Sequence, residues 1–301
     1  MISASSNEFS PPGLPPVQPP SGRFIIQLFV VPGAIILFVV LIVLGFSYYG
    51  KRSHDPEHFL RQLDSDNPAI RWRAASDLAQ ILKRPEPATL RWKADPKFAL
   101  DLAERLDREW KDLLEQEKTL AGQIGPSTEN KQLIWRKLRV QRDRVTFLGA
   151  ALGEFHFAVG APVLCAIVKH GDSKDLEGNT QQRRMALWAL MSLGENLKGF
   201  AKIPPEQSQS VVATLRAEAI GSTPRAQWAR TALYYLDKTP GDDLVKVDDT
   251  LAVSAEADDR FLRELTAMAF NFWDGPHAET ILLKLAHDTG RGTLVRAEGD
   301  D

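Results

Sequence analysis

The chain has 301 residues, a formal net charge of −2 and one cysteine, Cys165. A single cysteine excludes an internal disulfide framework and is compatible with a reducing compartment. Hydrophobic residues make up 44% of the sequence and charged residues 25%, which is typical of a folded protein rather than of a disordered one.

The first 23 residues are rich in proline (SPPGLPPVQPPSG) and show no apolar periodicity. This composition predicts a disordered or polyproline-like tail over residues 1–23. A docking peptide for a proline-binding domain is an alternative interpretation of the same segment.

Residues 24–49 form an apolar run without a single charged side chain, between Arg23 and the pair Lys51-Arg52. At about 1.5 Å per residue, a helix of this length exceeds the hydrocarbon thickness of a bilayer, about 30 Å. A cleaved secretory signal is the alternative, but such a signal has an apolar core of about 7–15 residues after a basic segment. Residues 1–22 carry only one charge, Glu8. The sequence therefore predicts an uncleaved, single-pass transmembrane helix that contacts the membrane through residues 24–49.

The orientation of this helix follows from the flanking charges. Basic residues favour the cytoplasmic side of a membrane. Lys51 and Arg52 after the apolar run outnumber Arg23 before it. We therefore expect a membrane protein whose C-terminal domain lies in the cytoplasm.

A helical pattern begins after the apolar run. Asp66 or Asn67 can cap the start of a helix, and Pro68 fits its first turn. Ala74, Leu78 and Ile81 then lie on one helical face, at i, i+4 and i+7. With its Asp-x-Pro turn, arginine and paired alanines, this segment resembles the second helix of a HEAT repeat. The resemblance implies an α-solenoid that binds a protein partner on its surface and has no chemistry of its own.

The same apolar spacing recurs along the chain at Leu148/Leu152/Phe155, Ala186/Leu190/Leu193, Ala229/Leu233/Leu236 and Leu265/Ala269/Phe272. The middle residues of successive stripes are separated by 74, 38, 43 and 36 positions, which is close to one or two periods of a helix-pair repeat. Apolar runs at 161–169, 205–219 and 276–287 would supply the first helix of a pair. Because one pair cannot bury its apolar face alone, the pairs must stack. We predict an all-α, HEAT-like helical repeat domain over residues 54–290.

Residues 97–155 interrupt this period. A 3/4 apolar spacing runs through a long segment on each side of the breaker residues 122–127. We predict an elongated helical hairpin that replaces or extends one repeat and projects from the array, with two ordinary repeat helices and long loops as the alternative. At the other end of the chain, residues 291–301 are predicted to form an acidic, flexible tail.

A basic cluster lies in the second half of this hairpin. Two interpretations stay open: a surface that contacts a partner or phosphate groups, and a solvated surface with partial ion pairing. The cluster does not line one narrow helical face and has no interleaved aromatic residues, so nucleic acid is not the favoured ligand. The candidate contact residues are Lys131, Arg136, Lys137, Arg139, Arg142 and Arg144.

The sequence contains no recognisable catalytic or cofactor motif: no P-loop, no GxGxxG and no GxSxG. His54 and His58 have the spacing of zinc ligands but lack a third ligand, and Cys165 lies in an apolar run. Asp242-Asp243 and Asp248-Asp249 could bind a cation only if a loop brought the two pairs together. Trp72, Trp188 and Trp228 are expected to pack in the core, with one or two of them available as binding anchors. We therefore expect no enzyme activity, no metal and no cofactor.

Together these features predict a membrane-tethered, non-catalytic scaffold that binds a protein partner of unknown identity through a HEAT-like solenoid. Two alternatives remain: charge-driven binding of nucleic acid or anionic lipid through residues 131–144, and an enzyme similar to the HEAT-like lyases or DNA glycosylases.

Overall fold

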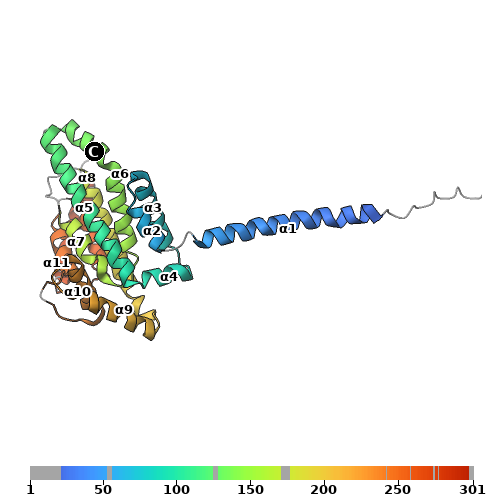
Figure 1. The fold of residues 1–301 in the computed structure, drawn as a ribbon. Coiled ribbons are helices and arrows are strands. Elements are labelled where there is room, and N and C mark those ends of the chain that lie inside the picture. The colour runs from blue at the N-terminus through green and yellow to red at the C-terminus, as the bar shows by residue number, and fades with distance from the viewer. Residues whose placement is uncertain are drawn as a thin grey trace, which may run out of the picture. The chain divides into compact units, whose positions relative to one another are not determined.

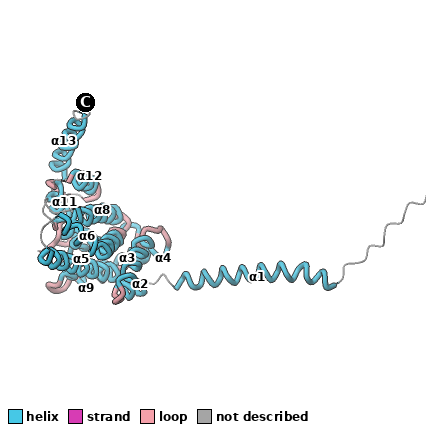
Figure 2. Tube along the Cα trace, turned by 90° about the horizontal axis from the view of Figure 1, so that it is seen from above, coloured by secondary structure: helices cyan, strands magenta, loops and turns pink. Residues whose placement is uncertain are grey.

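The structure is a computed structural model that describes residues 22–52, 56–124, 128–170, 177–241, 243–257, 259–273, 275–276 and 278–297. Within these ranges the chain is helical and contains no strand, which confirms the all-α prediction for this part (Figure 2). The elements are α1 (Gly22–Arg52), α2 (Pro56–Leu63), α3 (Pro68–Leu82), α4 (Pro87–Lys93), α5 (Pro96–Ile124), α6 (Thr128–Leu152), η1 (Ala158–Gly160), α7 (Ala161–Lys169), α8 (Glu177–Leu197), η2 (Phe200–Lys202), α9 (Pro205–Glu218), α10 (Pro224–Asp237), α11 (Val247–Ala255), α12 (Arg260–Ala269) and α13 (Ala278–Ala297).

The chain divides into two compact units, Met1–His54 and Asp55–Asp301. The first unit contains α1, a helix of 31 residues with Pro32 inside it. Its side chains are described over residues 30–45, all of which are apolar, and the large ones among them are exposed. Among the residues whose side chains are described, which in α1 are 30–45, no helix is both long and apolar enough to cross a membrane. Most of the predicted tail, residues 1–21, lies outside the described residues.

The second unit consists of helix pairs stacked in two layers. α2, α5, α7 and α11 follow one another in one layer, and their partners α3, α6, α8 and α12 follow one another in the other. α13 packs against the last pair, α11 and α12. Each pair covers the apolar faces of its neighbours, so one continuous core runs from Phe59 to Trp273.

The predicted apolar stripes face this core. Ala74, Leu78, Leu152 and Leu190 are almost completely buried. The start of α3 also agrees with its sequence signals, because the side chain of Asn67 accepts a hydrogen bond from the backbone N–H of Ala69 (2.9 Å) and Pro68 occupies the first turn.

The two long helices α5 and α6 lie side by side (Figure 1). α6 also packs against α3 and against α8. α5 and α6 form a long helical hairpin, and since α6 is itself one of the stacked helices, the hairpin takes the place of one repeat and only its tip extends beyond the stack. Only the ends of α5 and α6 near their connection are largely exposed, around residues 115–123 and 129–140.

Ala229 and Leu233 of the stripe at 229–236 are buried and Leu236 is partly buried, but α10 does not take the place in the stack that a regular series of repeats would give it. α8 and α12 contact each other directly, and α10 instead packs with α9 against α5, α7 and η1. The α9–α10 pair is thus an insertion on the side of the stack.

A further difference from the sequence-based prediction concerns the C-terminus, where a flexible tail was expected over residues 291–301. α13 continues to Ala297, so residues 291–297 are helical, and residues 298–301 lie outside the described part.

Candidate functional site

The predicted basic cluster divides into an exposed half and a buried half. Arg136, Lys137 and Arg139 are exposed on α6. The side chain of Lys131 lies outside those described. Arg142 and Arg144 are each only 5% exposed, so they do not belong to the exposed surface that the other members of the cluster share.

The two buried arginines are held by carboxylates on α5. Arg142 forms an ion pair with Glu117, and Nη2 of Arg144 donates to a carboxylate oxygen of Glu109 at 2.7 Å. Burial lowers the pKa of Arg142 to about 10. Their physical role is to join α6 to α5, because a buried arginine needs a carboxylate partner to compensate for its lost hydration.

The exposed half of α6 combines charge with apolar surface. Leu133, Arg136, Lys137 and Val140 follow one another at i, i+3, i+4 and i+7, which places them on one helix face. All four are exposed. We call these four residues the α6 strip. It can offer a partner both apolar contact and positive charge.

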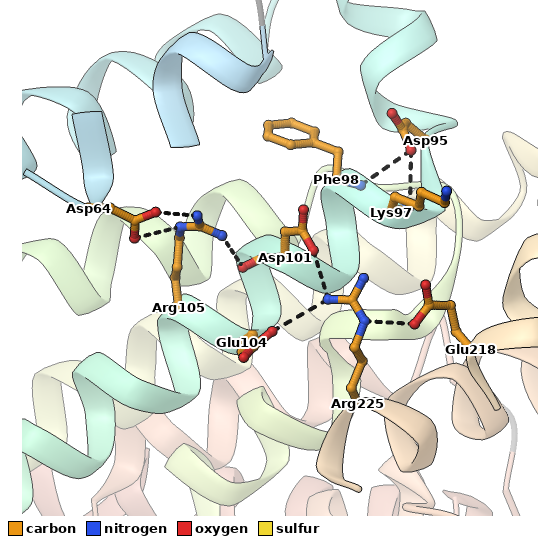
Figure 3. A network of polar contacts seen from close by, with 9 residues as sticks. All are labelled: Asp64, Asp95, Lys97, Phe98, Asp101, Glu104, Arg105, Glu218 and Arg225. Atoms are coloured by element: carbon orange, nitrogen blue, oxygen red, sulfur yellow. Dashed lines mark hydrogen bonds and ion pairs between the residues drawn. The ribbon is translucent and has the colours of Figure 1, made fainter. Parts of the chain in front are cut away.

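A second group of charged residues fixes the α9–α10 insertion to α5 (Figure 3). Arg225, at the start of α10, donates to Asp101 at 2.7 Å and approaches Glu104 at 3.4 Å, both on α5. Its Nε donates to Glu218 of α9 at 2.8 Å. One guanidinium thus links three helices.

The same face of α5 holds the turn after α2. Arg105 donates from Nε and Nη2 to the two carboxylate oxygens of Asp64, at 3.1 and 2.5 Å (Figure 3). The sequence did not single out this network. The sequence pattern that could have indicated it is the spacing of Asp101, Glu104 and Arg105 at i, i+3 and i+4. Such charged residues are common on solvent-exposed helices, and the pattern does not show which residues they pair with.

The residues considered for catalysis or metal binding have structural contacts. His58 shares a hydrogen bond with Gln62 at 2.9 Å, while His54 lies outside the described residues. Burial raises the pKa of the Cys165 thiol to about 12, which keeps it protonated. The side chains described contain no group of three or more His, Cys, Asp and Glu residues that would hold a metal ion.

The two acidic pairs do not converge on a cation either. Asp243 accepts hydrogen bonds from Arg230, Asp248 is buried at the start of α11, and Asp249 is exposed. Asp242 falls outside the described residues.

The three tryptophans have different environments. Trp228 is buried in the core. Trp72 packs edge-on against Phe147 at a ring distance of 5.8 Å and stays partly exposed. Trp188 on α8 is 50% exposed and is therefore the tryptophan best placed as a binding anchor.

Comparison of the sequence with models of known protein families and with characterised proteins gives no match.

Proposed function

We propose that the chain is a membrane-tethered, non-catalytic scaffold of the HEAT-like type, which holds a protein partner on its helical unit. The observation that carries the proposal is α1, a helix of 31 residues whose described side chains are apolar and exposed. A helix with apolar side chains on every face needs lipid or protein around it. The uncharged segment 24–49 has the length that the hydrocarbon core of a bilayer requires.

The helical unit supports the scaffold part of the proposal. Its paired helices stack in two layers, as in an α-solenoid, and the first stripe has the residue pattern of a HEAT repeat. The charged groups named above mostly join one helix to another. Such an array offers surface for binding, and a tether raises the concentration of a bound partner at the membrane.

The α6 strip is the surface that we assign to the partner. Its leucine and valine provide an apolar centre, and its arginine and lysine favour a partner with acidic residues around its own apolar contact. Charge-driven binding of nucleic acid or lipid is less well supported, because Arg142 and Arg144 are buried in ion pairs and do not contribute to the surface.

The test is affinity capture of the full-length chain from cross-linked membranes. Leu133 and Val140 are replaced together by serine, and Leu90→Ser, at an exposed apolar position on α4, is the matched control. We expect one acidic protein to be captured by the wild type and by the control, and lost with the double variant. Equal capture by all three proteins, or no specific capture, would contradict the proposal.

A further inference from the structure

A small cavity of about 250 Å³ lies among α2, α3, α5 and α6. Its lining is mostly charged, and four arginines dominate it: Arg71, Arg105, Arg108 and Arg144. Neither the proposed tether nor the α6 strip involves this cavity.

The arginines of the cavity outnumber their carboxylate partners. Asp64 is fully used by Arg105. Glu109 serves two cations at once, with Nη2 of Arg144 at 2.7 Å and Nη1 of Arg71 at 3.5 Å from its carboxylate oxygens. Arg108 is exposed and has no ion pair or hydrogen bond with the residues described here. Asp112 is the only other carboxylate in the lining beside Asp64 and Glu109. The guanidinium groups of Arg71, Arg108 and Arg144 therefore share two acids, Glu109 and Asp112.

The unsatisfied atoms of this cluster are hydrogen-bond donors. Nε of Arg71 and Nε of Arg144 are buried and have no partner in the described structure. Buried donors of this kind are rare in folded proteins and are costly to leave unpaired. Burial lowers the pKa of Arg144, and the nearby positive charge of Arg71 lowers it further, although Glu109 opposes both effects. A guest that brings acceptor oxygens and negative charge would relieve both the missing hydrogen bonds and this repulsion.

The size of the cavity limits the guest. A volume of about 250 Å³ is below the range of pockets for drug-sized ligands, about 300–1,000 Å³. It suits one anionic group with a few water molecules. The planar fork of arginine matches the oxygens of carboxylate and phosphate in a two-pronged arrangement. We propose that this cavity is a binding site for a small oxyanion, a phosphate or carboxylate group, held by Arg71, Arg108 and Arg144.

The test is thermal unfolding of the full-length chain in detergent micelles, titrated with inorganic phosphate, sulfate or succinate. Sodium chloride at equal ionic strength is the reference for screening. We expect at least one of the three anions to raise the melting temperature with saturation, beyond the effect of chloride. Phosphate and sulfate would identify a tetrahedral oxyanion, and succinate a carboxylate.

Two variants make the test specific to the cavity. Arg108→Gln removes an exposed cation and should weaken binding by about tenfold, the factor expected for one charge-assisted hydrogen bond. Arg139→Gln makes the same charge change on α6, outside both the cavity and the α6 strip, and should leave the affinity unchanged within about twofold.

Glu109→Gln should have the opposite effect on anion binding and strengthen it. It removes the acid that competes with the guest, so the ligand-free protein should melt lower and the anion should stabilise it more than it stabilises the wild type. No saturable effect for any of the three anions, or equal losses with Arg108→Gln and Arg139→Gln, would overturn the proposal.

Discussion

Replacing Gly194 by alanine should destabilise the helical unit, although alanine is normally the better helix former. Gly194 lies in α8 where the segment after α12 crosses it. A Cβ atom there would come within 2.7 Å of both Cβ of Phe272 and Nε1 of Trp273. Trp273 is 2% exposed, and its Nε1 donates a hydrogen bond to the carbonyl oxygen of Leu190 at 2.7 Å. The added methyl group must therefore displace a buried ring and its hydrogen bond.

The magnitude follows from three contributions. Overpacking in a core costs about 1–3 kcal/mol. The buried hydrogen bond of Trp273, if broken, adds about 1 kcal/mol or more. The higher helix propensity of alanine returns up to about 1 kcal/mol. The net loss is about 2 kcal/mol, which lowers the melting temperature of a unit of this size by about 4–8 °C.

The assay is thermal unfolding followed by tryptophan fluorescence, with Gly122→Ala as the matched control. Gly122 lies in α5, and a Cβ atom there would meet nothing within 4 Å. The control should melt at or slightly above the wild-type temperature, because only the propensity contribution remains. A Gly194→Ala protein as stable as its control would refute the packing of Phe272 and Trp273 against α8 described above.

Two further predictions concern the insertion and the buried titratable groups. Arg225→Gln should speed amide hydrogen exchange in α9 and α10, because the links of Arg225 to α5 and α9 are lost. Arg216→Gln, which removes an exposed ion pair, should leave the exchange rates unchanged. Equal exchange rates in the two variants would contradict the link between the three helices. Burial raises the pKa of Cys165 to about 12 and also raises that of Tyr235. Their contribution to stability is complete below the pKa of the unfolded thiol, about 8.5, and is lost as the pH rises toward 12. Urea unfolding should therefore show a lower free energy of unfolding at pH 10.5 than at pH 8. A thiol reagent should label Cys165 only after the protein unfolds. Rapid labelling of the folded protein would contradict the burial of Cys165.

Much of the fold was predictable because it depends on local signals. The cap and proline at the start of α3 and the apolar run that becomes α7 act within one helix, and periodicity marks the face that is buried. Periodicity does not say which neighbour covers that face. The stripe around Leu233 was therefore buried as expected, but against α5 and α7 rather than between α8 and α12.

The candidate site was less predictable for a related reason. Arg142 and Arg139 look alike in the sequence, but only Arg142 has a carboxylate opposite it on α5. The partner, Glu117, is distant in the sequence, so nothing local distinguishes a buried arginine from a solvated one. The cavity between Arg71 and Arg144 likewise arises only when α3, α5 and α6 come together.

The central claim is that α1 anchors a folded helical unit to a membrane. The most direct test is extraction of isolated membranes with alkaline carbonate and with high salt, combined with protease treatment of intact cells. The account predicts that the full-length chain stays in the membrane pellet until detergent is added, whereas a chain without residues 22–52 is found in the supernatant. It also predicts that residues 55–301 are protected from protease added to intact cells. Release of the full-length chain by salt or carbonate would contradict the anchor, and digestion of residues 55–301 in intact cells would contradict the cytoplasmic orientation.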